Sequence, residues 1–278
     1  MDGLHYTAFS EAERLALGSH WINTYAKWHW LIEPMFWGHE HVSKDKPALW
    51  VGNHSMMAFA DASLMLRELY QQHGIVMRAL AQHTHFKIPI WKQALTNNGA
   101  VDGTRENCQA MMAANEHILV YPGGGGEVMK RKGEQHQLRW KKRTGFARMA
   151  IENNYPIQPF AAVGADDCWD ILYDNNELKE TLLGRLLTDY LGVKGEELPP
   201  LIKGIGPTLL PKPQRMYFRF FPLVYPQAFQ HLPIDEGALA LRNHVEHIVQ
   251  EGINELLAYR QTDPYQSLSA RLRRKIRD

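Results

Sequence analysis

A histidine and an aspartate lie seven positions apart, just after a short apolar run. Residues 48–51 predict a buried strand. The apolar run ends at Gly52-Asn53, and His54 follows directly. Asp61 follows where an apolar-periodic helix begins. Histidine accepts a proton near neutral pH, and a carboxylate can fix its tautomer and stabilise the charged ring. The pair therefore indicates a general base with its orienting group. A loop histidine beside an ordinary helix N-cap is the alternative that this stretch leaves open.

A glycine-rich stretch follows a second predicted strand, residues 118–121. It reads Tyr121-Pro122, then Gly123, Gly124, Gly125 and Gly126, and ends at Glu127. Glycines let a backbone approach a ligand closely and turn N–H groups toward an anion. The stretch lacks the Gly-Lys-Ser/Thr ending of a Walker loop and does not match the dinucleotide fingerprint. It predicts either a ligand-binding loop or a flexible surface turn.

A basic segment comes next, over residues 129–148. Its cations are Lys130, Arg131, Lys132, Arg139, Lys141, Lys142, Arg143 and Arg148, against the single acid Glu134. A solvated face is the usual explanation of such a run. Its place beside a glycine-rich strand end also suits the docking of phosphate groups.

Strands and helices alternate through the middle of the chain. The patterns predict strands near residues 48–51, 76–81, 99–101, 118–121, 157–163 and 216–224, and helices near 62–73, 91–95, 106–116, 145–153 and 239–259. This alternation predicts an α/β fold, a single domain with a mostly parallel central sheet flanked by helices. Sites in such sheets lie at the carboxyl ends of strands, where both His54 and the glycine-rich stretch fall.

The chain divides into an N-terminal amphipathic helical region, residues 1–45, and a domain of residues 46–278 that includes the C-terminal helix. Residues 10–37 predict one or two helices, with Trp21, Tyr25 and Trp28 at helical spacing. That aromatic face suits core packing, and it also suits a helix lying at a membrane interface. A leucine-rich face over residues 178–190 suits core packing, a lid, a partner surface or a membrane contact. A basic tail over residues 271–277 suits a solvated helix end or contact with anionic lipid.

The composition is that of a globular protein. The 278 residues are 45% hydrophobic and 22% charged, and the net charge is +1, which gives no general attraction to nucleic acid. The two cysteines form no metal or disulfide pattern, so we expect no metal. No apolar run is long enough to span a membrane, and the N-terminus lacks signal-peptide features. We expect a cytoplasmic protein, soluble or peripheral on the inner face of an anionic membrane.

Four ordered motifs resemble the glycerolipid acyltransferases, the PlsC-like phospholipid/glycerol acyltransferase superfamily, in its monoacylglycerol and diacylglycerol acyltransferase branch. The motifs are Gly52-Asn53-His54-Ser55 with Asp61-Ala62, Tyr121-Pro122-Gly123-Gly124 with Glu127, residues 142–150, and residues 155–160 with 163–167. Residues 99–105 match the second block weakly, and the resemblance spans about residues 48–225. This chain has six residues between His54 and Asp61, where the superfamily usually has four.

The resemblance implies an acyltransferase domain acting in phospholipid and other lipid metabolism, without a cofactor. A fatty acyl group would move from an acyl thioester, acyl-CoA or acyl carrier protein, to a hydroxyl of a glycerolipid or other lipid-like alcohol. His54 would be the general base and Asp61 its orienting group. The amides of residues 123–126 would bind the oxyanion, Glu127 would hold the acceptor or brace the loop, and Arg105 and Lys130 would contact donor phosphates. An acyl-thioester hydrolase and a catalytically inactive lipid- or carrier-binding protein remain as alternatives.

Overall fold

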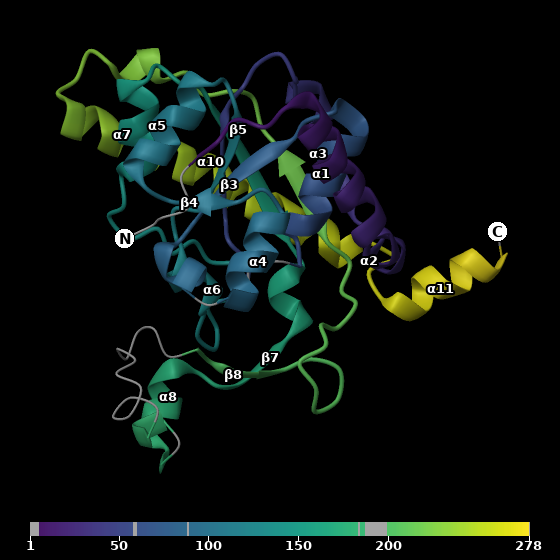
Figure 1. Cartoon of the computed structure of the whole chain (residues 1–278). Helices are drawn as coiled ribbons and strands as arrows, with labels where there is room; N and C mark the ends of the chain where they lie inside the picture. Colours follow the sequence, from purple (N-terminus) through teal and green to yellow (C-terminus); the bar gives the residue numbers. More distant parts are fainter. Residues whose placement is uncertain (1–5, 58–59, 88, 183, 187–198, 278) are drawn as a thin grey trace.

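A seven-stranded sheet forms the centre of the computed structural model, which describes residues 6–57, 60–87, 89–182, 184–186 and 199–277 (Figure 1). Its strands are β1 (Met35–Trp37), β2 (Leu49–Gly52), β3 (Met77–Ala81), β4 (Val101–Asp102), β5 (His117–Val120), β6 (Ile157–Val163) and β9 (Tyr217–Phe220). They are ordered β1-β9-β6-β2-β5-β3-β4. Strands β6, β2, β5, β3 and β4 run parallel, β9 is antiparallel to β6, and β1 is parallel to β9. The predicted α/β class with a mostly parallel sheet is confirmed.

Helices cover both faces of this sheet (Figure 1). One face carries α1 (Glu11–Thr24) and α3 (Ala62–His73), and the other carries α5 (Arg105–Ala113), α7 (Gly145–Glu152) and α10 (Ile234–Thr262). The remaining described helices are α2 (Ala26–Ile32), α4 (Pro89–Asn97), α6 (Gly125–Val128), α8 (Asn175–Glu180) and α11 (Leu268–Arg277), with 3-10 turns η1 (His39–His41), η2 (His83–Lys87), η3 (Ala165–Cys168) and η4 (Pro226–Phe229). Strands β7 (Asp170–Tyr173) and β8 (Leu201–Lys203) form a separate antiparallel pair.

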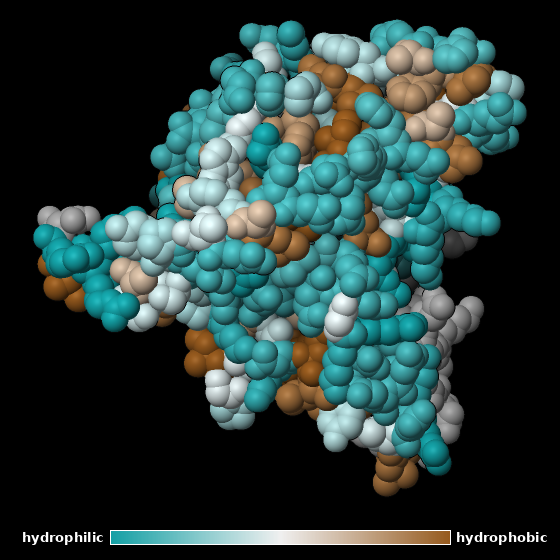
Figure 2. Space-filling view, turned by 180° about the vertical axis from the view of Figure 1, so that it is seen from behind, coloured by the Kyte–Doolittle hydropathy of each residue, from teal (hydrophilic) through white to brown (hydrophobic). Residues whose placement is uncertain are grey.

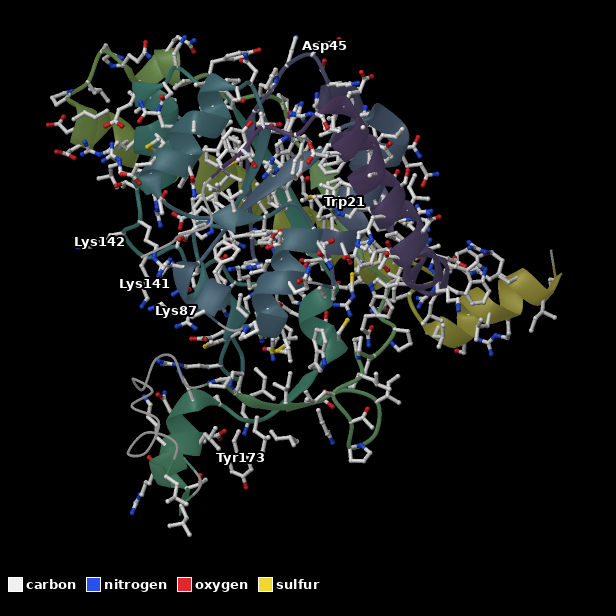
Figure 3. All side chains as sticks on the ribbon, viewed as in Figure 1. Trp21, Asp45, Lys87, Lys141, Lys142 and Tyr173 are labelled. Atoms are coloured by element: carbon white, nitrogen blue, oxygen red, sulfur yellow. The ribbon has the colours of Figure 1, made fainter. Side chains whose placement is uncertain are left out.

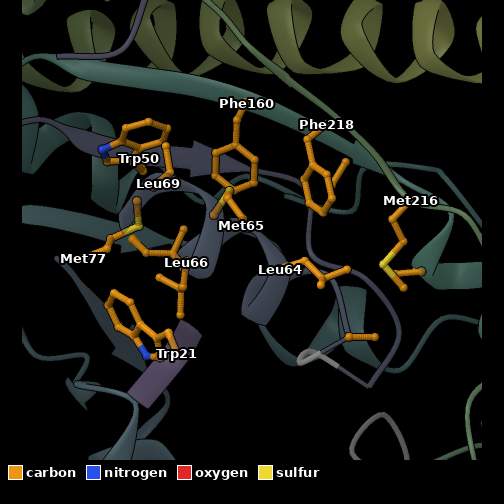
Figure 4. Packing of buried hydrophobic residues seen from close by; sticks show 14 of the residues in the cluster. Trp21, Trp50, Leu64, Met65, Leu66, Leu69, Met77, Phe160, Met216 and Phe218 are labelled. Atoms are coloured by element: carbon orange, nitrogen blue, oxygen red, sulfur yellow. The ribbon is translucent and has the colours of Figure 1, made fainter. Parts of the chain in front are cut away.

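The side chains of the central strands divide the core into two layers. In β2, Leu49 and Val51 pack among residues of α5, α7 and α10, whereas Trp50 packs on the α1 and α3 side. This alternation follows from the two-residue repeat of a strand. Figure 4 shows Trp50 and Phe160 projecting from the sheet toward the leucine and methionine side chains of α3. The strand ends that carry His54 and the glycine-rich stretch are thereby fixed by packing on both faces.

The helix that follows the His54 segment has the predicted bounds. Asp61 is its N-cap and accepts a hydrogen bond from the N–H of Ala62. Gly74 ends it with a φ of 65°, a left-handed conformation that glycine adopts without strain. The segment expected to be helical over residues 10–37 differs, because the helices end at Ile32. Glu33 then takes a φ of 48° and turns the chain, so that residues 35–37 join the sheet beside β9.

The aromatic face of the N-terminal helices packs inward at its centre. Trp21 is completely buried against the α3 side of the core, which confirms core packing for that side chain. Residues 6–45 therefore contribute a strand and part of the main core as well as helices. Among the described residues, no helix is both long and apolar enough to cross a membrane.

An excursion between β6 and β9 contains β7, α8 and β8 and projects from the body of the protein (Figure 1). The leucine-rich face predicted over residues 178–190 falls partly on it. Leu178 is buried, whereas Leu182 and Leu186 are exposed. Leu183, Leu187 and Tyr190 lie outside the described residues.

Candidate active site

His54 and the glycine-rich stretch lie side by side at the carboxyl edge of the sheet. They follow β2 and β5, which are parallel neighbours, so both strands end at the same edge. The ring of His54 stacks on the ring of Tyr121, with ring centroids 3.8 Å apart and planes 2° from parallel. Sequence reasoning placed both segments at strand ends, and the structure brings them into contact.

Glu127 holds the backbone of His54. One carboxylate oxygen, Oε2, accepts the N–H of His54 at 2.9 Å, and the other, Oε1, accepts the N–H of Arg139 at 2.9 Å. The side chain is completely buried. Of the two roles considered for Glu127, these hydrogen bonds fit the bracing of the loop, because both of its oxygens already accept backbone N–H groups.

A buried ion pair holds the other side of the same segment. The Nζ atom of Lys130 donates to the carbonyl oxygen of His54 at 3.0 Å and to Oδ2 of Asp166 at 2.6 Å. Asp166 in turn accepts the N–H of Met56 at 2.7 Å. The side chains of Lys130 and Asp166 are 1% and 2% exposed. Lys130 therefore does not present its charge at the surface, as a contact with a donor phosphate would require.

Asn53 ties the segment to the neighbouring strand. Its Nδ2 donates to the carbonyl oxygen of Ala162 at 2.8 Å, and its Oδ1 accepts the N–H of Ala162 at 2.9 Å. Ala162 lies two residues beyond Phe160, the partner of Gly52 in the ladder between β2 and β6. The Asn53 side-chain amide thus forms the two hydrogen bonds that a further backbone pair of this ladder would form. The residue before His54 is therefore anchored to β6.

The expected hydrogen bond between His54 and Asp61 is not formed. Oδ1 of Asp61 accepts the hydroxyl of Ser55 at 2.8 Å and the N–H of Ala62 at 2.7 Å. Nδ1 of His54 is buried and has no hydrogen-bond partner within the described part of the chain. The carboxylate is committed to the helix N-terminus and to Ser55, so the ring is oriented by the Tyr121 stack and by its backbone.

Burial sets the protonation of the two central groups. The pKa of His54 is lowered to about 3, first by burial and then by the positive charges of Lys130 and His85. Burial raises the pKa of Glu127 to about 7, against the opposing effect of its hydrogen bonds from Arg139 and His54. At neutral pH His54 is therefore the uncharged imidazole, the form that a general base requires.

The glycine-rich loop is held in one shape by arginines. Nη1 of Arg143 donates to the carbonyl oxygens of Pro122 and Gly123 at 3.0 and 2.6 Å, and Arg139 donates to that of Gly126 at 3.0 Å. A Cβ atom on Gly123 would come within 2.1 Å of the Glu127 side chain, whereas one on Gly126 would meet no atom within 4 Å. The loop is thus fixed where it touches Glu127 and open at Gly126.

The basic segment divides between structural and exposed cations. Its arginines at 139 and 143 bind the loop, while Lys141 and Lys142 are exposed and, like Lys87 of η2, extend outward on the same side of Figure 3. Arg105 is exposed and pairs with Glu152 at 2.7 Å. Within the described part of the chain, Arg105 forms no hydrogen bond or ion pair with His54 or the glycine-rich loop.

A second histidine–aspartate pair at this edge was missed by the sequence reasoning. Nδ1 of His83, after β3, donates to Oδ2 of Asp102, at the end of β4, at 2.6 Å. Asp102 is buried, and His83 is half exposed. Gln82, beside His83, has its Oε1 only 3.4 Å from the place a Cβ of Gly125 would occupy. The strand-end rule that selected His54 would have selected these residues too, because Asp102 directly follows the predicted strand 99–101 and His83 lies two residues after the predicted strand 76–81.

Among the described residues, no group of three or more histidine, cysteine, aspartate or glutamate side chains is arranged to hold a metal ion.

Comparison with known proteins confirms the resemblance. Residues 34–163 match the family model described as Acyltransferase. Phytyl ester synthase 2, chloroplastic, of Arabidopsis thaliana is 29% identical over 254 residues, which cover 84% of this chain and 35% of that protein. Diacylglycerol O-acyltransferase 2B of Umbelopsis ramanniana is 28% identical over 148 residues, covering 52% of this chain and 42% of that protein. The chain thus spans well under half the length of these relatives.

A solved structure supports the fold. The 1-acyl-sn-glycerophosphate (LPA) acyltransferase PlsC of Thermotoga maritima matches with a TM-score of 0.53 at 15% identity. The match covers 88% of this chain and 80% of PlsC. The family match includes His54, Asp61 and the whole glycine-rich stretch.

Proposed function

We propose that this chain, an acyltransferase-family protein over residues 34–163, transfers a fatty acyl group from an acyl thioester to a hydroxyl of a lipid-like alcohol. The donor would be acyl-CoA or acyl carrier protein. The names of two relatives support a lipid-like acceptor, because one makes phytyl esters and the other acylates diacylglycerol. The observation that carries the proposal is the uncharged, partly exposed His54 beside a fixed glycine-rich loop.

In the proposed reaction His54 acts as the general base. Since Nδ1 is buried, Nε2 is the ring nitrogen that meets the acceptor hydroxyl and takes its proton. The hydroxyl oxygen attacks the thioester carbonyl carbon, the C–S bond breaks, and the thiolate leaves and takes up the proton from His54. The proposed reaction uses no serine or cysteine nucleophile. Amides on the open side of the glycine-rich loop, at Gly125 and Gly126, are the donors proposed for the carbonyl oxygen.

The test is an acyl-transfer assay with product identification. Purified protein is given acyl-CoA or acyl carrier protein with a long-chain isoprenoid alcohol, a diacylglycerol or a lysophosphatidic acid, and esters are identified by mass spectrometry. We expect His54→Ala to lower kcat by about 10²–10⁴, the value of positioned acid–base catalysis. His247→Ala, on the exposed face of α10, is the matched control and should keep full activity. A folded His54→Ala protein with undiminished turnover refutes the assignment.

The same assay separates the alternatives. Thiol release that needs no acceptor identifies a thioester hydrolase, and binding of lipid or carrier without any turnover identifies an inactive binding protein. Asp61→Asn tests whether Asp61 acts on His54 during turnover. A loss of kcat as large as that of His54→Ala would show that it does, although its carboxylate is bound to Ser55 in this structure.

For membrane contact we propose a different surface from the N-terminal helix and basic tail. In α11, Arg271 is buried, Arg274 pairs with Glu33, and Lys275 lies 3.7 Å above the ring of Trp30. The β7–β8 excursion instead exposes large apolar side chains, at Leu172, Tyr173, Leu182, Leu186, Leu201, Ile205, Leu209 and Leu210. Figure 2 shows apolar side chains along the lower edge of the molecule, where this excursion lies.

Flotation with vesicles tests this surface. We expect the protein to float with anionic vesicles and a Leu209→Glu/Leu210→Glu variant to float less, because charged side chains resist burial among lipids. Wild-type protein that stays at the bottom of the gradient with both anionic and neutral vesicles contradicts the proposed contact.

A further inference from the structure

Three side chains from distant parts of the chain form hydrogen bonds with the backbone around His54. Glu127 accepts the N–H of His54, Lys130 donates to the carbonyl oxygen of His54, and Asp166 accepts the N–H of Met56. These partners are 73, 76 and 110 positions away in the sequence. Three hydrogen bonds to the backbone of His54 and Met56 leave this segment little freedom.

We propose that the buried Lys130–Asp166 ion pair is a positioning device for His54, which fixes the imidazole through the main chain instead of through a carboxylate on Nδ1. The proposal deepens the function proposed above and rests on it for the catalytic part. It assigns neither residue to the chemistry, since each acts through His54.

The energetics of burial favour this interpretation. Taking a lysine and an aspartate out of water is costly, and a buried ion pair is often no more stabilising than an apolar pair of similar size. Both charges here are almost completely removed from solvent. Asp166 compensates by accepting three donors, the ammonium of Lys130 and the N–H groups of Met56 and His136. Two of those partners, Lys130 and Met56, lead directly to the His54 segment.

The unpartnered Nδ1 of His54 leaves the orientation of the ring to other contacts. A histidine base needs its ring held in one orientation, and that is commonly done by a hydrogen bond to the second ring nitrogen. Nδ1 of His54 has no such bond among the described residues, so the orientation depends on the Tyr121 stack and on the position of the main chain. Loss of the backbone grip would let the ring move relative to a bound substrate.

A second buried ion pair provides a matched control. Arg215 and Asp263 are 8% and 2% exposed and lie 2.8 Å apart, and Asp263 also accepts a backbone N–H, that of Tyr265. In the part of the chain that the structure describes, neither residue forms a hydrogen bond or ion pair with the His54 segment. The double variants Lys130→Met/Asp166→Asn and Arg215→Met/Asp263→Asn therefore remove similar charges from similar depths, without leaving one charge buried alone.

The experiment measures hydrogen exchange and steady-state kinetics on the same proteins. For Lys130→Met/Asp166→Asn we expect exchange in the peptide covering residues 49–57 to be about tenfold faster, the factor for one typical hydrogen bond. We expect kcat to fall about 10²-fold with KM little changed, because a displaced catalytic group slows the chemical step. The control pair should change neither. If that protein does not fold, Lys130→Gln/Asp166→Asn replaces it; this pair also leaves neither charge buried alone, and it should change exchange and kcat in the same direction by a smaller factor.

The outcomes test the positioning role and the proposed function separately. Unchanged exchange in residues 49–57, or an equal loss of kcat in the control, overturns the positioning role. Wild-type protein without any acyl transfer overturns the proposed function alone, and faster exchange in that case still supports the grip of the ion pair on His54.

Discussion

Glu127 is expected to make the stability of this protein depend on pH in an unusual direction. Its carboxyl group is completely buried, and its pKa is raised from 4.5 to about 7. A shift of that size corresponds to about 3 kcal/mol, the cost of keeping the carboxylate ionised inside the folded protein. Replacing Glu127 with glutamine removes the titrating group with little change in shape.

The direction of this pH dependence follows from whether the folded or the unfolded protein binds the proton of Glu127. Between pH 4.5 and about 7 the folded protein binds a proton at Glu127 that the unfolded chain has released. The favourable contribution is therefore complete below pH 4.5 and is lost as the pH rises to about 7. His54 acts in the opposite direction, because its lowered pKa makes folding weaker as the pH falls below 6.5. Only the difference between wild type and Glu127→Gln isolates the Glu127 contribution.

Urea unfolding at pH 5, 6, 7 and 8 measures that difference. The free energy of unfolding of wild type minus that of Glu127→Gln should fall by about 3 kcal/mol over this range, or slightly less because titration begins below pH 5. Glutamine also leaves one backbone N–H without its acceptor, which adds a constant offset of about 1–3 kcal/mol. A difference that stays flat with pH, whatever its offset, refutes the burial argument.

Two further substitutions test the surrounding geometry. Gly123→Ala places a Cβ against the fixed side chain of Glu127 and should destabilise the protein by about 1–3 kcal/mol in thermal or urea unfolding. Gly126→Ala meets no atom and should be neutral or stabilising by up to about 1 kcal/mol, so equal losses at both positions would contradict the loop described here. Asn53→Ala leaves both backbone groups of Ala162 unpaired and should cost about 2–5 kcal/mol; a change within error would show that water replaces the amide.

The sequence predicted the framework of this site well, because that framework depends on short-range patterns. Short continuous apolar runs predicted β2 and β5, and the helical repeat after Asp61 predicted α3 with its observed bounds. Parallel strands place their carboxyl ends together, so the strand-end rule located His54 and the glycine-rich loop at one edge. These inferences need only neighbouring residues and the topology.

The contacts of the site could not be predicted in the same way. Asp61 and His54 are close in sequence, yet the carboxylate turns to Ser55 and to its own helix. Lys130 stands in a run of surface-type cations, and nothing local distinguishes it from its neighbours. Its burial follows from the position of Asp166, which approaches only when β6 pairs with β2.

The lowered pKa of His54 and the hydrogen bonds that hold its backbone are linked through the same residues. A carboxylate on Nδ1 would stabilise the imidazolium and raise the pKa of His54. Burial without that partner, beside the ammonium of Lys130, lowers it to about 3 and keeps the ring uncharged even in mildly acidic solution. The ring then lacks the hydrogen bond that usually orients it, and the backbone contacts of Lys130, Asp166 and Glu127 supply the orientation instead. Lys130 thus serves both needs, since its charge disfavours the imidazolium while its N–H groups hold the chain.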